Sequence, residues 1–232
     1  WTVNTFISSL GSAGFNSEKL RLPEDISIAG NGYKYVANGG AQTVIVFDEN
    51  DQIVNEISIA PIPGVETGTY PANAVFVDSS SRIYVVDTGR SRIGLYDNPF
   101  DTSVTPWTPG VRYPEELFKD SNGYFFITSG IEHSVKIFNG IQVLEQSLGV
   151  QNEPGSDNSH FNTPQDLVTD SNGNIYVVDS NNHRVQVFTQ QGAYLRTLGT
   201  GLQGDTHGTF HNPTGIALSD ANELYITDSG NN

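Results

Sequence analysis

The sequence predicts an all-β protein built from one repeated unit. A short segment rich in β-branched and aromatic residues, such as Ile175-Tyr-Val-Val-Asp179, occurs five times. A proline precedes each copy, at spacings of 48, 43, 50 and 49 residues: Pro23, Pro71, Pro114, Pro164 and Pro213. Signals for helices are nearly absent, and a period of this length is typical of repeat architectures.

Each unit has the pattern of four short strands, seen most clearly in the fourth repeat. Its elements are a strand at 166–169, an Asp/Asn-Gly type turn, a strand at 175–178, a polar hairpin at 180–183, a strand containing Val185 and Val187, and a strand at 194–198. Four antiparallel strands at this period predict a β-propeller, because stacked blades bury sheet faces that one blade cannot bury alone. We expect one domain over residues 1–232, with repeats starting near 23, 71, 114, 164 and 213, the last incomplete. The residues expected to be buried between blades are Ile175, Val177, Val185 and Phe188.

The segment from Pro164 to Phe188 resembles the NHL repeat. It fits the pattern Pro-x-x-Leu-x-x-Asp-x-x-Gly-x-Ile-Tyr-Val-x-Asp-x-x-Asn-x-Arg-Val-x-x-Phe almost completely, and Asn182-His183-Arg184 is the counterpart of the Asn-His-Leu triplet that names the family. The resemblance covers nearly the whole chain and is weaker in the first repeat, where Ala29 and Asn38 replace two aspartates. Enzymes, RNA-binding regulators and extracellular interaction domains share this scaffold, so the resemblance implies a fold more than a function.

The fifth repeat stops after its second strand, near Asp228. Residues 6–11 match the fourth strand of the other repeats, which predicts a closing strand at 1–11 with Val3, Phe6 and Ile7 as its apolar residues. Three arrangements remain open. The chain is a fragment of a longer, six-bladed ring, a five-bladed ring with one thin blade, or a unit whose open edge takes a strand from a neighbour. The last arrangement is head-to-tail and generates a filament.

Composition excludes some classes of partner. The chain carries 26 Asp and Glu against 11 Lys and Arg, a formal net charge of −15, which disfavours binding to nucleic acid. No apolar run approaches the roughly 18 to 20 residues of a membrane-spanning helix. Cysteine and methionine are absent and the chain begins at Trp1, which indicates a mature or processed sequence. We expect an extracellular or secreted protein.

Carboxylates and carboxamides follow the blade prolines and are expected to ring one mouth of the central channel. These candidate metal ligands are Glu24, Asp25, Asn73, Glu115, Glu116 and Asp166. Calcium takes six to eight oxygen ligands, so the ring predicts a possible Ca²⁺ site. The alternative is an acidic rim hydrogen-bonded to backbone and water, which the large negative charge favours.

Other candidate chemistry is weaker. Peptide-amidating lyases, which resemble NHL propellers, hold zinc through histidines directly after the blade prolines, and this chain has none there. A loose metal site of His160, His207 and His211 is less favoured than ordinary loop histidines. The Asp that recurs once per repeat, as in Asp179, is expected to accept hydrogen bonds from its own turn and to belong to the scaffold.

Two classes of function follow from these observations. The favoured one is a non-catalytic extracellular scaffold that binds a protein, peptide or glycan, or assembles with itself into an oligomer or filament. The alternative is a calcium-dependent hydrolase or lyase that uses the acidic channel mouth.

Overall fold

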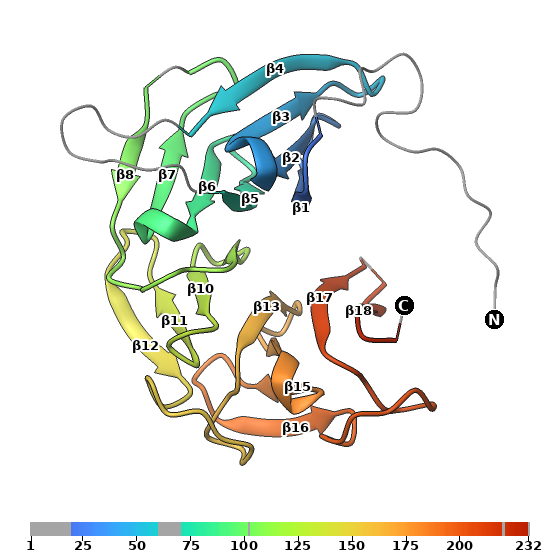
Figure 1. The fold of residues 1–232 in the computed structure, drawn as a ribbon. Helices are drawn as coiled ribbons and strands as arrows, with labels where there is room; N and C mark the ends of the chain where they lie inside the picture. Colours follow the sequence, from blue (N-terminus) through green and yellow to red (C-terminus); the bar gives the residue numbers. More distant parts are fainter. Residues whose placement is uncertain (1–19, 60–70, 102, 220, 232) are drawn as a thin grey trace. The chain divides into compact units, whose positions relative to one another are not determined.

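A computed structural model describes residues 20–59, 71–101, 103–219 and 221–231, all as strands, turns and loops (Figure 1). The only helical elements in these ranges are three short 3-10 turns: η1 (Gly39–Ala41), η2 (Thr88–Arg90) and η3 (Ser180–Asn182). Within the same ranges, no helix is both long and apolar enough to cross a membrane. The all-β prediction is confirmed.

The first two sheets each have four antiparallel strands in chain order. The first contains β1 (Pro23–Ile28), β2 (Lys34–Asn38), β3 (Thr43–Phe47) and β4 (Ile53–Ser58). The second contains β5 (Ala72–Val77), β6 (Ile83–Asp87), β7 (Arg92–Tyr96) and β8 (Thr105–Trp107).

The third and fourth sheets repeat this order, and the last has two strands in the described part of the chain. The third contains β9 (Leu117–Lys119), β10 (Phe125–Ser129), β11 (Ser134–Phe138) and β12 (Leu144–Leu148). The fourth contains β13 (Pro164–Thr169), β14 (Ile175–Asp179), β15 (Arg184–Phe188) and β16 (Tyr194–Leu198). The fifth pairs β17 (Pro213–Leu218) with β18 (Leu224–Asp228). Each first strand begins within three residues of a repeat proline, as predicted.

The chain comprises two compact units, and the boundary between them falls inside the second sheet. One unit extends to Val85 and includes Leu95–Thr105, and the other consists of Val86–Gly94 and the chain from Pro106 onward. The first unit has a core between its sheet faces that contains Tyr35, Val44 and Ile83.

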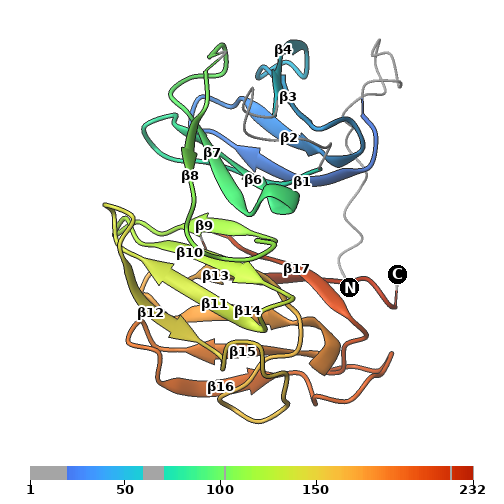
Figure 2. The same cartoon turned by 60° about the vertical axis from the view of Figure 1, so that its left-hand side comes forward.

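The second unit buries the faces of its sheets against one another. The third and fourth sheets lie side by side (Figure 2), and one apolar cluster joins Phe126 and Ile137 of the third to Ile175 and Phe188 of the fourth. A second cluster contains Val185 and packs against strands β17 and β18. All four residues predicted to lie between blades are at most 4% exposed, which confirms that prediction.

Candidate ligand-binding pocket

Two of the predicted metal ligands join neighbouring first strands. Oδ2 of Asp25 accepts the N–H of Val75 at 2.9 Å, and Oδ2 of Asp166 accepts the N–H of Ile216 at 2.7 Å. Their Oδ1 atoms accept the N–H of the next residue in the chain, at 2.7 and 2.6 Å. Burial raises the pKa of Asp25, and the two backbone donors offset part of that rise. These carboxylates therefore connect one sheet to the next.

The remaining predicted ligands lie on or just before the first strand of their sheets. Glu116 accepts the N–H of Leu117, and the backbone of Glu115 bonds to Thr128 of the adjacent strand. Glu24 is exposed, and Asn73 is partly buried on β5. In the described ranges, no group of three or more His, Asp or Glu side chains is positioned to hold a metal ion. The calcium site stays a prediction, and the assembly residues Val3, Phe6 and Ile7 lie outside the described residues.

The repeated aspartate is part of the scaffold, but its main backbone partner differs from the prediction. Oδ1 of Asp179 accepts the N–H of Asn162, and Oδ1 of Asp228 accepts that of His211, each 17 residues upstream rather than in the same turn. The physical reason is that the 3-10 turn after β14 closes its own backbone hydrogen bond, from His183 to Ser180. The carboxylate is thereby available to the loop that enters the sheet.

Histidines of the repeat hold the next sheet in the same way. Nδ1 of His133 accepts the N–H of Thr163, and Nδ1 of His183 accepts that of Asn212, both at 3.1 Å. Thr163 and Asn212 directly precede the repeat prolines, and the two histidines have φ of 52° and 51°. The rings of His183 and His211 meet edge to face at 6.0 Å. These histidines therefore have structural roles.

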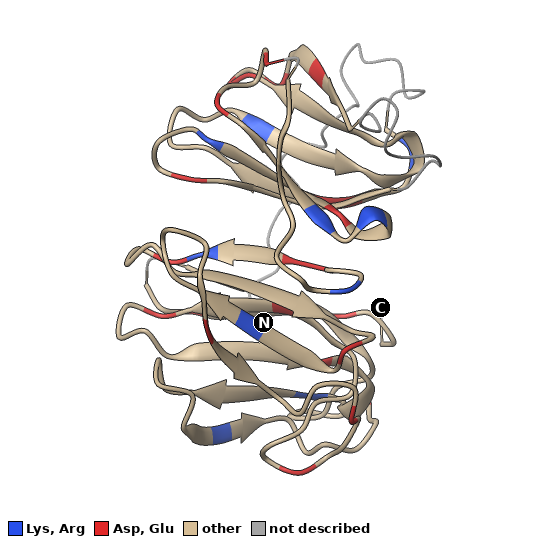
Figure 3. Ribbon diagram, turned by 90° about the vertical axis from the view of Figure 1, so that its left-hand side faces the viewer, with Lys and Arg blue, Asp and Glu red and all other residues tan. Residues whose placement is uncertain are grey.

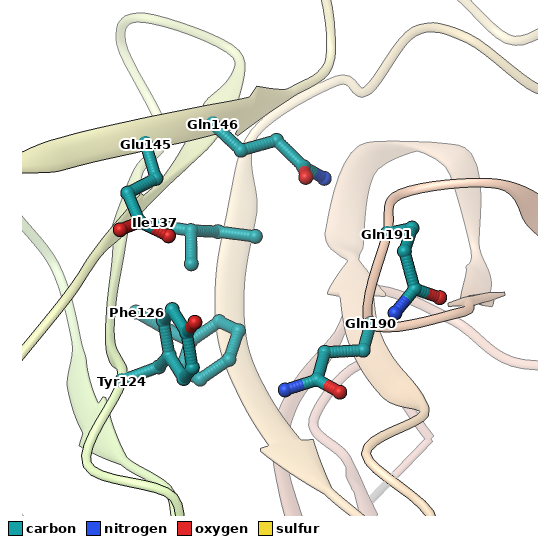
Figure 4. A pocket seen from close by; sticks show the side chains of 7 residues that line it. All are labelled: Tyr124, Phe126, Ile137, Glu145, Gln146, Gln190 and Gln191. Atoms are coloured by element: carbon teal, nitrogen blue, oxygen red, sulfur yellow. The ribbon is translucent and has the colours of Figure 1, made fainter.

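A pocket of about 280 Å³ opens between the third and fourth sheets (Figure 4). Its floor consists of Tyr124, Phe126 and Ile137. Gln146 on β12 approaches from one side, and Gln190 in the turn between β15 and β16 approaches from the other. Aromatic floors with a few convergent polar groups are typical of small-ligand sites.

The glutamines of this pocket are not engaged by the scaffold. Within the described residues, the side chains of Gln146, Gln190 and Gln191 form no hydrogen bond to another protein group, whereas Glu145 accepts the amide of Asn139 at 2.9 Å. Each carboxamide offers two N–H donors and one acceptor oxygen. No lysine or arginine lines the pocket, and cations are dispersed among acids over both units (Figure 3). The site therefore suits a hydrogen-bonding ligand that carries no negative charge.

The sequence analysis missed these pocket residues. Two of them, Gln190 and Gln191, occupy a turn that differs between repeats, where the third repeat has Gly140-Ile141. The pair of adjacent glutamines, which the corresponding turns of the other repeats lack, is the signal that was available.

Comparison with known proteins supports the fold. Residues 161–188 and 210–232 match the NHL repeat model. A streptogramin B lyase structure aligns with a TM-score of 0.65 and 16% identity over 89% of this chain and 62% of that one. An auxiliary nutrient binding protein from Bacteroides ovatus aligns with a TM-score of 0.70 and 17% identity, over 90% of this chain and 57% of that one. A chain of the nidogen/laminin complex aligns with a TM-score of 0.68 and 15% identity, over 90% of this chain and 72% of that one. No curated protein matches the sequence significantly.

The fold and its repeated contacts define a β-propeller. Its fourth and fifth repeats match the NHL repeat model. Because the chain spans only 62% of the length of the lyase and shares 16% identity with it, this likeness shows the fold and not the activity.

Proposed function

We propose that this propeller is a non-catalytic binding scaffold that presents the pocket between its third and fourth sheets to a protein, peptide or glycan. The ligand donates and accepts hydrogen bonds at the glutamines and packs an apolar surface on Tyr124, the partly buried residue of the floor. An extracellular location and head-to-tail assembly through residues 1–11 are further parts of this proposal, and both rest on the sequence alone.

The observation that carries the proposal is that some polar side chains hold the fold together while the glutamines of the pocket have no partner among the described residues. Asp25, Asp166 and Asp179 are held by hydrogen bonds within the scaffold, whereas Gln146 and Gln190 are not. Polar groups without scaffold partners beside an aromatic floor are what a binding site requires. Tyr124 and Glu145 line the pocket, but no hydrogen bond in the described part of the chain joins them as a nucleophile and its base.

The test is a binding screen with paired proteins. Glycan and peptide arrays are probed with the wild type and with the Gln146→Ala/Gln190→Ala variant, after both are shown to have the same melting temperature. We expect ligands that bind the wild type and lose affinity in the variant, with no change in ligand mass after incubation. Equal binding by the two proteins places the site elsewhere, and a changed ligand mass contradicts the non-catalytic assignment.

The assembly proposal has a separate test. Deleting residues 1–10 from a polymeric protein should release single units, because each unit would lose the strand that it donates. In a monomer that closes on itself, the deletion should lower the melting temperature without changing the mass. If neither quantity changes, residues 1–10 do not close the fifth sheet.

A further inference from the structure

A second pocket lies next to the first along the same two elements. It has a volume of about 670 Å³ and is lined by Ser147 and Leu148 of β12 and by Gly192 and Tyr194 at the start of β16. The first pocket uses the preceding residues of both elements, Gln146 and Gln191. The two pockets therefore follow one another along the edge of β12.

Gly192 marks the junction between the pockets. It has φ +81°, and a Cβ atom added there would collide with the amide of Gln146 and approach Leu148 to 3.0 Å. The glycine therefore lets the turn before β16 pack directly against Gln146 and Leu148 where the two pockets adjoin. β12 has five residues. At about 3.3 Å per residue the strand extends about 16 Å, which is longer than a single sugar ring.

The second pocket repeats the chemistry of the first. It offers the exposed ring of Tyr194 beside the polar side chains of Asp157, Asn158 and Ser159, and the buried ring of Phe188 supports Tyr194 at a centroid distance of 6.1 Å. His160 and the Ser159 N–H and hydroxyl hold the pKa of Asp157 well below its usual value, so this group is a carboxylate at neutral pH. No lysine or arginine lines this pocket either.

Resting on the proposed function, we propose that the ligand is an uncharged oligosaccharide that runs along β12 and occupies both pockets. The C–H faces of sugar rings pack on aromatic side chains, and their hydroxyls bond to carboxamides and carboxylates. Glu145 and Asp157 disfavour an anionic chain, because like charges without a compensating cation are costly. Two successive sites of the same chemistry favour a repeating ligand over a single small molecule.

The test uses neutral oligosaccharides of several sugars and linkages, each from disaccharide to hexasaccharide, together with matched uronic acid oligomers and cationic peptides. Affinities are measured by calorimetry on the full chain. We expect at least one neutral series to bind, with the hexasaccharide at least about tenfold tighter than the disaccharide, because the longer chain reaches both pockets. Matched uronic acid oligomers should bind more weakly.

Variants assign the two pockets. Tyr194→Ala should remove the gain in affinity from chain length, while Tyr194→Phe, which keeps the ring, should retain it. Gln190→Ala should weaken every chain length about three- to tenfold, since it removes a hydrogen bond that all of them use. Gln52→Ala is the matched control, because it changes a glutamine in the corresponding turn of the first sheet, outside both pockets.

The outcomes separate this inference from the proposed function. Binding of peptides or uronic acids alone, with loss in Gln190→Ala, keeps the pocket and overturns the oligosaccharide. If neutral glycans bind with an affinity that depends neither on chain length nor on Tyr194→Ala, the ligand does not occupy both pockets. If Gln190→Ala changes no affinity at all, both this inference and the proposed function are wrong.

Discussion

The third and fourth sheets hold the loops that enter them with the same kind of contact made by different residues. In the fourth sheet, Arg184 pairs with Asp179 at 2.7 Å and donates to the carbonyls of Ser156, Asp157 and His160. The third sheet has Ser129 at the position of Asp179 and Ser134 at that of Arg184.

The third sheet has its charge pair at other positions of the repeat than the fourth sheet does. Glu132 takes the place of the carboxylate and lies 3.2 Å from Nζ of Lys136, and Lys136 donates to the carbonyl of Gly110 in the entering loop. All four charged residues of the two pairs are buried. A buried cation that binds loop carbonyls therefore requires a nearby carboxylate, but no fixed position for it.

The largest expected effect comes from breaking the pair in the fourth sheet. Asp179→Ala leaves Arg184 buried without its carboxylate and removes the acceptor of the Asn162 N–H. We expect a loss of about 3 to 5 kcal/mol in the free energy of unfolding, measured by urea denaturation. Asp97→Ala, which breaks an exposed pair with Arg82, is the control and should cost less than about 1 kcal/mol. Similar losses in the two variants would show that the buried pair has no special weight.

A comparable loss is expected from the core between the two sheets. Phe188 is 4% exposed and meets Phe161 edge to face at 5.7 Å. Phe188→Ala should lower the free energy of unfolding by about 3 to 5 kcal/mol, because it leaves a cavity among rigid sheets. Phe100→Ala changes a phenylalanine that is 62% exposed and should have little effect. A loss below about 1 kcal/mol for Phe188→Ala would contradict the packing described for this residue.

A smaller loss is expected in the third sheet, and it tests whether the relocated pair is equivalent. Glu132 has three polar partners: Lys136 forms an ion pair with Oε2, and Arg112 and Gln151 donate to Oε1 at 3.3 and 3.1 Å. Glu132→Gln keeps the shape of the side chain and removes the charge, so we expect a loss of about 1 to 3 kcal/mol in urea denaturation. Glu145→Gln, an exposed neutralisation on the same sheet, is the matched control. If Glu132→Gln is neutral, Lys136 is held by the loop carbonyl alone.

The fold was predictable because it depends on what repeats. The prolines, the β-branched second strands and the buried Ile175 and Phe188 recur at fixed offsets, and each recurrence strengthens the prediction. The Glu132–Lys136 pair was not predicted because its residues do not occupy the repeated positions. The turn with Gln190 was not predicted because its sequence differs between repeats. The hydrogen bond from Asn162 to Asp179 was not predicted for another reason: it spans 17 residues and depends on the geometry of the loop between them.

The smallest expected effect concerns pH and the carboxylate that joins the first two sheets. Burial raises the pKa of Asp25 above its unfolded value, so the folded state binds the proton more tightly than the unfolded chain does. The corresponding stabilisation is fully present below the unfolded pKa and is lost as pH rises through the folded pKa. Asp25→Asn removes this titration.

The measurement is the difference in free energy of unfolding between the wild type and Asp25→Asn across acidic and neutral pH. We expect the wild type to gain stability relative to the variant as pH falls from neutrality toward the unfolded pKa of the aspartate. Asp97→Asn, at an exposed carboxylate in the same unit, corrects for the general effect of removing one negative charge. A gain in the opposite direction would mean that the N–H groups of Val75 and Ile26 outweigh burial. Asp25 would then stabilise the fold in its charged form, because hydrogen bonds donated to a carboxylate favour the anion.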